Sequence, residues 1–240
     1  MAKQQHIFNF PEGEMLLIDK PLNWTSFDVV NFLRSFIRKM YNIKKLKVGH
    51  AGTLDPLATG LLIICTGKLT KKIDAYQGMD KTYVGNLKMG YTTPSYDAET
   101  ESDNKFDTSQ LSNIELIKAT ELFKGEIEQV PPIYSAIKVA GKRAFKHARK
   151  NEEVHLKSRK VTVHEFDLYN IDLPDINFRV RCSKGTYIRS LVHDFGKSLR
   201  NGAYMTGLRR TEIGDYKVAE AYTVEEFRKI VLEQAVLFNK

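Results

Sequence analysis

The shortness of the apolar runs is the feature that most constrains the fold of this chain. The longest run, Leu61–Cys65, has the length of a buried strand and falls far short of a bilayer span. Residues 176–182 alternate strictly between apolar and polar side chains, which is typical of a strand with one buried face. Strands and helices follow one another without a regular β-α-β rhythm, so the sequence predicts an α+β fold rather than a doubly wound parallel sheet.

A capping signal marks the start of one helix. Thr25 with Asp28 three residues later resembles a capping box, so the cap is Thr25 or Ser26. An apolar stripe follows at helical spacing: Val30, Leu33, Ile37 and Met40. We also expect strands at Met15–Asp19, 61–65 and 81–90, helices at about 113–124, 188–199 and 223–236, and an exposed acidic loop over 91–107.

The positive charge of the chain is clustered. Of its 240 residues, 37 are basic and 29 acidic, which gives a net charge of +8. Two stretches contain basic residues and no acid. They run from Val29 to Leu54 (Arg34, Arg38, Lys39, Lys44, Lys45, Lys47) and from Gln129 to Asn151 (Lys138, Lys142, Arg143, Lys146, Arg149, Lys150). Fields of a single sign suit a polyanionic partner, although a solvated basic face is the simpler interpretation.

Several classes of site are disfavoured. Cys65 and Cys182 lie in apolar segments and in no C-x-x-C pair, so we expect buried, inert thiols. The six histidines show no H-x-x-x-H spacing, and no metal site is expected. The stretch "TGKLTKK" lacks the spacing of a phosphate-binding loop. The N-terminus has no apolar run of signal-peptide length, so we expect a cytoplasmic protein.

One carboxylate stands out in the first basic stretch. In "GHAGTLDPLATGLLIICTG", residues 49–67, Asp55 is the only acid. Pro56 keeps Asp55 out of the helical region and gives its side chain a defined direction. A turn-capping aspartate is the simpler interpretation. The surrounding positive charge keeps this group ionised, however, and an ionised, positioned carboxylate is a candidate nucleophile.

This stretch resembles the catalytic loop of the TruB family of pseudouridine synthases. Further motifs occur in family order: "DKPLNWTS" (19–26), "KTYVG" (81–85), "VPPIYSAIKVAGKRAFKHAR" (130–149), "SKGTYIRSLVHDFG" (183–196) and "LRRTEIG" (208–214). The resemblance implies the pseudouridine synthase fold, with a mixed, mainly antiparallel central sheet flanked by helices and loops. It also implies one catalytic domain over residues 1–240, with an RNA-binding insertion at about 130–152. Many bacterial members continue into a small C-terminal RNA-binding domain, and here the chain departs from them, because we expect no separate C-terminal PUA-type RNA-binding domain.

The resemblance further implies an isomerase that converts one uridine in the T-arm loop of tRNA, at tRNA position 55, to pseudouridine without metal or organic cofactor. Asp55 would be the nucleophile on a flipped-out base. Attack at C1′ and initial deprotonation at C2′ both remain open. His50 would fill the gap left by the flipped base or stack beside it, unless it is an ordinary loop histidine.

The same resemblance assigns the walls of the uracil pocket. Tyr83 would stack on the pyrimidine, unless it is a core tyrosine. Lys81 lies on the same strand face, and a core face seldom carries a lysine, so we expect that face to open on a cleft. Arg189 is the expected partner of Asp55, unless it is a surface arginine. Because it falls outside the apolar stripe of its helix, it need not be buried. The remaining assignments are Tyr187 and Leu208 in the pocket, and Lys20 and Pro21 in support of the loop.

Recognition of RNA is expected from the insertion. The residues predicted to contact RNA are Lys142, Arg143, Lys146, Arg149 and Lys150. The expected partner is the T-arm stem-loop of tRNA, bound by a monomer with neither guide RNA nor membrane. Two other functions stay open: a non-catalytic RNA-binding protein on the same scaffold, and an enzyme that depends on a guide RNA and protein partners.

Overall fold

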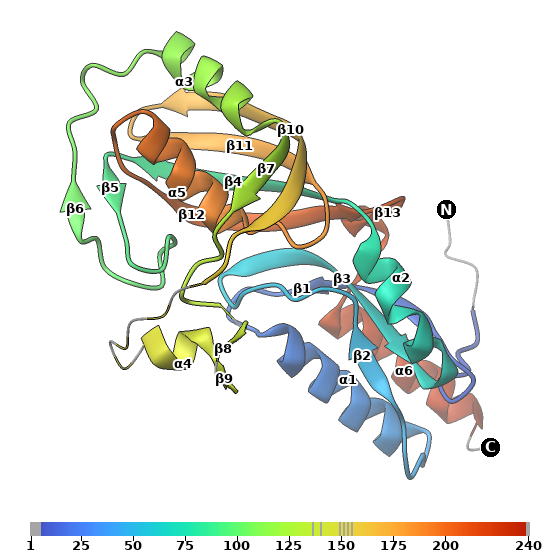
Figure 1. Ribbon diagram of the computed structural model, residues 1–240. Helices are drawn as coiled ribbons and strands as arrows, with labels where there is room; N and C mark the ends of the chain where they lie inside the picture. Colours follow the sequence, from blue (N-terminus) through green and yellow to red (C-terminus); the bar gives the residue numbers. More distant parts are fainter. Residues whose placement is uncertain are drawn as a thin grey trace. The chain divides into compact units, whose positions relative to one another are not determined.

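The computed structural model describes residues 6–135, 137–139, 141–148, 150, 152, 154 and 156–238. The chain forms two compact units (Figure 1). Met1–Met79 and Arg209–Lys240 make up the first, here called the terminal unit, and Asp80–Leu208 make up the second, the middle unit. Each unit combines a mainly antiparallel sheet with helices, so the predicted α+β class is confirmed.

The sheet of the terminal unit is built around the long apolar run. Its strand order is β14 (Tyr222–Thr223), β1 (Met15–Lys20), β3 (Ala58–Thr66) and β12 (Ala203–Ile213, in this unit from Arg209), with β2 (Val48–His50) paired to β3 and β13 (Tyr216–Lys217) paired to β12. β1 and β3 are antiparallel, with Ile18 opposite Leu62. β1 and β14 are parallel.

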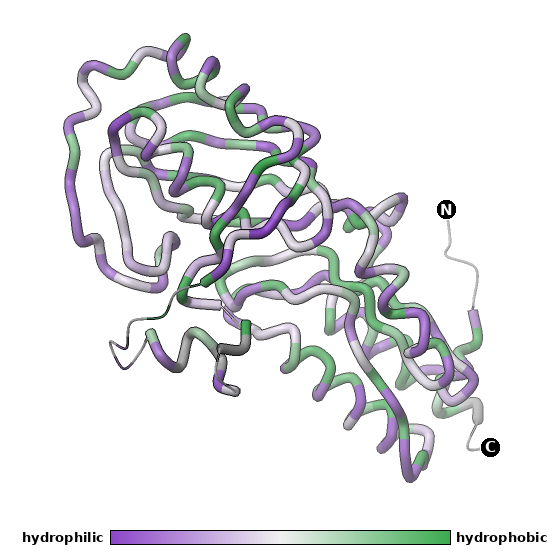
Figure 2. The backbone as a smooth tube through the Cα atoms, viewed as in Figure 1, coloured by the Kyte–Doolittle hydropathy of each residue, from purple (hydrophilic) through white to green (hydrophobic). Residues whose placement is uncertain are grey.

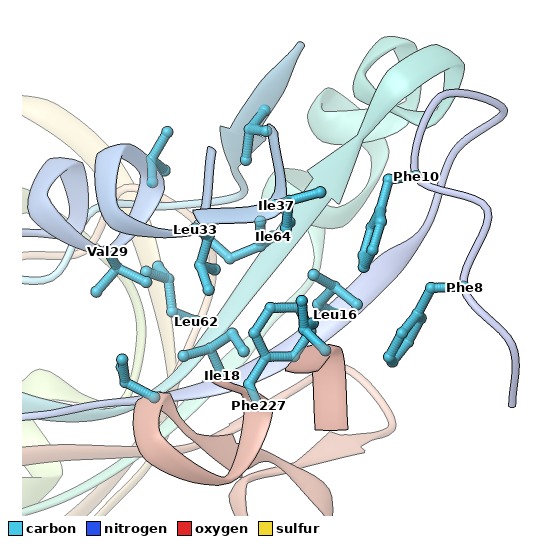
Figure 3. Packing of buried hydrophobic residues seen from close by; sticks show 14 of the residues in the cluster. Phe8, Phe10, Leu16, Ile18, Val29, Leu33, Ile37, Leu62, Ile64 and Phe227 are labelled. Atoms are coloured by element: carbon cyan, nitrogen blue, oxygen red, sulfur yellow. The ribbon is translucent and has the colours of Figure 1, made fainter. Parts of the chain in front are cut away.

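Two helices cover one face of this sheet (Figure 3). α1 (Ser26–Met40) begins at Thr25 with the predicted capping box, and Val30, Leu33 and Ile37 of the predicted stripe are buried. α6 (Val224–Phe238) contributes Phe227, which contacts Phe8 and Phe10. These side chains pack on Leu16, Ile18, Leu62 and Ile64 of β1 and β3.

The opposite face of β3 is buried as well. Leu61, Ile63 and Cys65 pack beneath η1 (Gly67–Lys72) and α2 (Ile73–Gly78). A strand that is covered on both faces reads as a continuous apolar run, which is why this segment shows no alternation. Cys65 is 0% exposed, so its predicted burial is confirmed, and burial raises the pKa of its thiol to about 11.

In the middle unit, β4 (Lys81–Met89), β11 (Asp175–Cys182), β10 (Arg159–Asp172) and β7 (Gly125–Gln129) pair with one another as antiparallel neighbours of the ten-stranded sheet. The strand order in this unit is β12 (up to Leu208), β4, β11, β10 and β7. The predicted inward face of β11 is confirmed, because Ile176, Phe178, Val180 and Cys182 are all buried. α5 (Ile188–Ser198) packs on this face through Phe195, whose ring lies 5.5 Å from that of Phe166.

Shorter elements complete the middle unit. They are β5 (Tyr91–Thr92), β6 (Asn104–Lys105), α3 (Asn113–Thr120), η2 (Glu121–Phe123), β8 (Lys138–Val139), β9 (Lys142–Arg143) and α4 (Ala144–Ala148), with η3 (Val218–Glu220) in the terminal unit. The loop through β6 is largely hydrophilic (Figure 2), and residues 101–107 are exposed as predicted. Within 91–100, however, Thr93, Ser95 and Asp97 are buried, so the prediction of an exposed loop is wrong at these positions. No helix in the described part of the chain has the length and apolarity needed to cross a membrane.

Candidate active site

The Asp55 loop, residues 51–57 between β2 and β3, is anchored through its backbone on both sides of the carboxylate. On one side, the Ser26 hydroxyl accepts a hydrogen bond from Leu54 N at 2.8 Å and lies 3.1 Å from Leu54 O. On the other side, Asn23 N donates to Pro56 O at 2.9 Å, and Ala58 N donates to Asp55 O at 3.0 Å. The motifs "DKPLNWTS" and "GTLDPLATG" are therefore joined in space around a half-buried Asp55.

A buried ammonium group lies beneath this loop. Lys20 is 0% exposed, and its Nζ donates to Pro21 O at 2.9 Å, to Trp24 O at 2.5 Å and to Pro56 O at 3.4 Å. Burial lowers the pKa of Lys20 to about 8, and the negative charge of Asp55 opposes that shift. The positive charge of Lys20 therefore acts directly on the Asp55 carboxylate.

His50 ends β2, immediately before the Asp55 loop, and is half-buried. Burial lowers the pKa of its imidazole, and the nearby Arg210 guanidinium lowers it further. Because its pKa lies below the ordinary value of 6.5, the ring is neutral near pH 7.

Tyr83 lies on β4 of the middle unit, opposite Val180, and Lys81 lies opposite Cys182. Tyr83 is 8% exposed and Lys81 is 5% exposed. Both side chains are therefore nearly buried, and the opening of their shared face on a cleft stays a prediction. β4 lies between β12 and β11 in the strand order, so its side chains have neighbours on either side.

Arg189, in the first turn of α5, is 3% exposed. Its Nη1 donates to Ser95 O at 3.2 Å and its Nη2 donates to Tyr134 O at 2.9 Å. Its Nε lies 3.4 Å from Asp97 Oδ2, in an ion pair that is buried on both sides. This pairing is why Asp97 is buried, against the prediction of an exposed acidic loop, and why Arg189 can lie in the interior. An Arg189–Asp55 contact would join the two units and stays a prediction.

Tyr187 caps α5 and is linked to a buried glutamine. Its backbone N donates to Gln129 Oε1 at 2.7 Å, and its backbone O accepts from Gln129 Nε2 at 3.0 Å. The Arg159 guanidinium lies 4.4 Å from the centroid of the Tyr187 ring. One turn along α5, the His193 ring stacks on Tyr96 with centroids 3.8 Å apart.

The remaining predicted residues are distributed as follows. Leu208 is half-exposed on β12, Pro21 is half-exposed after β1, and Lys142 and Lys150 are exposed. Arg143 belongs to β9 and Lys146 to α4, and their side chains lie outside the described residues, as does Arg149 altogether. In the described residues, no three His, Cys, Asp or Glu side chains are grouped to hold a metal ion.

Sequence reasoning missed several polar residues that shape these regions. The buried Asp97, Gln129 and Arg210 were not among its candidates. Of these three, only the burial of Arg210 could have been suspected from the sequence. Two successive arginines in a strand point to opposite faces, so one of them can face the interior.

Comparison with known proteins gives a consistent result. Residues 38–188 match a family described as TruB family pseudouridylate synthase (N terminal domain). Residues 189–237 match one described as tRNA pseudouridylate synthase B C-terminal domain. The chain is 55% identical to tRNA pseudouridine synthase B of Flavobacterium johnsoniae over 91% of this chain and 96% of that protein. It is 50% identical to the protein of the same name from Phocaeicola vulgatus, over 95% and 97% respectively.

Solved structures resemble the chain at lower identity. A Cbf5-Nop10-Gar1 complex contains a chain with TM-score 0.69 and 27% identity, covering 94% of this chain and 60% of that one. An H/ACA RNP bound to a substrate RNA containing 2′-deoxyuridine gives TM-score 0.65 and 27% identity, covering 92% and 53%. The chain thus spans between about half and three-fifths of those solved chains.

Proposed function

The chain belongs to the TruB family of pseudouridine synthases, and on that premise we propose that it converts the uridine at position 55 of tRNA, in the T-arm loop, to pseudouridine. The observation that carries this proposal is the Asp55 loop. One carboxylate is held there by backbone contacts on both sides, above the buried Lys20 ammonium. The relatives named tRNA pseudouridine synthase B match nearly the whole chain, which supports tRNA as the substrate.

The reaction begins with exposure of the base. A uridine inside a folded stem-loop must be flipped out, at a cost of a few kcal/mol. His50 precedes the catalytic loop and would fill the vacated space with a neutral ring. Loops are favourable targets because their bases can be splayed apart.

Asp55 then acts on the ribose. In one route its carboxylate attacks C1′, forming a C1′–O bond while the C1′–N1 bond breaks and uracil leaves as an anion. In the other it removes the C2′ proton as the same C1′–N1 bond breaks. Both routes need an ionised carboxylate, and the Lys20 ammonium favours that form. The freed uracil turns and its C5 bonds to C1′. In the first route the C1′–O bond to Asp55 breaks as this bond forms, and in the second Asp55 returns its proton to C2′. The C5 proton is then lost and N1 takes up a proton, so the product is an isomer of the uridine.

The middle unit supplies the walls of the pocket in this proposal. Tyr83 stacks on the uracil, and its hydroxyl assists the final removal of the C5 proton. Tyr187 and Leu208 close the pocket, and Arg189 orients the carboxylate of Asp55. These roles rest on the motif matches "KTYVG", "GTYIRSL" and "LRRTEIG". Pro21 and Lys20 support the loop, as their hydrogen bonds favour.

The function is tested with tRNA that carries 5-tritiated uridine. Purified protein, with no added guide RNA, protein or nucleotide, should release one tritium per tRNA, and a transcript with cytidine at position 55 should release none. Binding without release would favour the non-catalytic scaffold. Release only after addition of other RNA or protein would favour the guide-dependent enzyme.

The basic insertion is expected to hold the tRNA backbone. Charge reversal of Lys142 and Arg143 to Glu should weaken tRNA binding and reduce its salt dependence, because fewer counterions are released. The slope of log Kd against log salt concentration measures this effect. An unchanged slope would mean that the insertion does not contact RNA. A monomer with one catalytic domain would then have to bind the tRNA backbone through another basic face.

A further inference from the structure

The motif "LRRTEIG" contains a buried guanidinium to which the proposed chemistry gives no role. Arg209 and Arg210 are neighbours on β12 and leave the strand on opposite faces. Arg209 is half-exposed and binds both carboxylate oxygens of Asp19, at 3.0 and 2.6 Å. Arg210 is 1% exposed. One of the two arginines therefore points into the interior of the terminal unit.

The Arg210 side chain joins the two ends of the segment that carries Asp55. Its Nε donates to Leu61 O at 2.8 Å, and its Nη2 donates to Gly52 O at 3.0 Å. Leu61 lies within β3 and Gly52 lies in the turn after β2. A planar guanidinium fork can serve two carbonyls in fixed directions, which the single nitrogen of a lysine does poorly.

The backbone of Arg210 is fixed against the same segment. Gly60 has φ +106°, and a Cβ built there would lie 2.2 Å from Arg210 O and 2.7 Å from Arg210 N. Only glycine permits this approach. Arg210 therefore touches the segment through its main chain at Gly60 and through its side chain at Leu61 and Gly52.

The charge of Arg210 is not matched by an acid of its own. Both of its hydrogen bonds go to neutral carbonyls, and within the described residues it makes no ion pair. Arg210 also adds to the positive potential at Lys20, which Asp55 partly offsets. Burying a cation without a carboxylate partner costs folding free energy, so a residue with a purely structural role would seldom be a charged one. A buried cation of this kind suits a site in which a nearby carboxylate must stay ionised.

We propose that Arg210 is a positioning residue for Asp55, which ties Gly52 to Leu61, sets the direction of the carboxylate between them and adds positive charge that keeps it ionised. The inference rests on the proposed role of Asp55 as nucleophile. If Arg210 only held Gly52 and Leu61 together, its substitution would change the stability of the protein and not the rate of the reaction. A positioning residue affects the rate of the chemical step and its pH dependence, and leaves tRNA affinity unchanged.

Two variants of the full chain separate geometry from charge. Arg210→Lys keeps the charge and loses the fork, so single-turnover tritium release at saturating enzyme should slow by about 100-fold with an unchanged pH profile. Arg210→Met loses both. Its release should slow as well, and the acid limb of its rate profile should move to higher pH, because the ionised carboxylate loses a favourable neighbour. Binding of tRNA should be that of the unchanged protein in both variants.

Arg209→Lys is the matched control, because it alters the neighbouring, half-exposed arginine on the same strand. We expect the rate and pH profile of the unchanged protein. Thermal unfolding reports whether each variant is folded at the assay temperature. If Arg210→Met is not folded there, the result for Arg210→Lys alone decides the proposal. A folded Arg210→Lys with an unchanged rate would overturn it. Tritium release by an Asp55→Asn variant would instead overturn the proposed function, so the two failures are distinguishable.

Discussion

Both units bury an arginine, and the two are satisfied in different ways. In the middle unit, Arg189 has the Asp97 carboxylate as an ion-pair partner, together with two backbone carbonyls. In the terminal unit, Arg210 binds two backbone carbonyls. The first arrangement is a charge pair that stabilises its own surroundings, whereas the second leaves net positive charge near the Asp55 loop.

The difference extends to the residues around each arginine. The Asp55 loop is held almost entirely through backbone atoms, by Ser26, Asn23, Lys20 and Arg210. Such contacts fix the path of the chain on both sides of the Asp55 carboxylate. In the Arg189 region, the Asp97 carboxylate forms a buried ion pair with Arg189. Asp97 is therefore part of a buried ion pair, whereas Asp55 is the proposed reacting group.

The largest effect is expected from breaking the charge pair. Arg189→Met leaves the Asp97 carboxylate buried and unpaired, which should lower the free energy of unfolding by about 3–5 kcal/mol. Urea unfolding measures this loss. The double variant Arg189→Met with Asp97→Asn should recover part of it, because no unpaired charge remains. A double variant as unstable as the single one would contradict the charge-pair interpretation.

A smaller effect is expected from releasing one anchor of the Asp55 loop. Ser26→Ala removes the partner of Leu54 N and O and should cost about 1–3 kcal/mol of stability. Single-turnover release should also slow, since the carboxylate loses its fixed position. Ser198→Ala, which removes a serine–carbonyl bond at the end of α5, is the matched control and should leave the rate unchanged. Equal rates for both variants would mean that this anchor does not position Asp55.

The smallest effect concerns the cap of α1. Thr25→Ala should destabilise the protein by about 1 kcal/mol. Hydrogen bonds from the Thr25 side chain and backbone hold the pKa of Asp28 below its ordinary value of 3.8. The stabilisation is therefore present above pH 3.8 and is lost as the pH falls through the lowered pKa. Thermal unfolding from pH 7 to pH 3 should show the two proteins converging at low pH, and a constant difference would argue against this cap.

Local signals predicted much of the fold. The Thr25–Asp28 cap, the β11 alternation and the apolar β3 run each depend on neighbours in sequence, and all three are confirmed. β10 was not predicted because register shifts between Val163 and Glu165, and between Tyr169 and Ile171, interrupt its alternation. β12 was not predicted either, because its two adjacent arginines interrupt the alternation of apolar and polar residues.

Candidate site residues could be predicted only at positions that belong to a recognisable sequence motif. Asp55 stands out as a lone acid, and its loop was expected from Gly and Pro spacing. The burial of Asp97 could not be read from an acidic segment, because it depends on Arg189, which lies far along the chain. The burial of Lys81 and Tyr83 could likewise not be predicted from the alternation of residues along β4.

The most direct test of the account is single-turnover tritium release by Asp55→Asn, with tRNA binding measured in the same sample. The account predicts binding equal to that of the unchanged protein and no release at tRNA position 55, because the amide cannot act as the nucleophile or base. Release by this variant at the rate of the unchanged protein would contradict it.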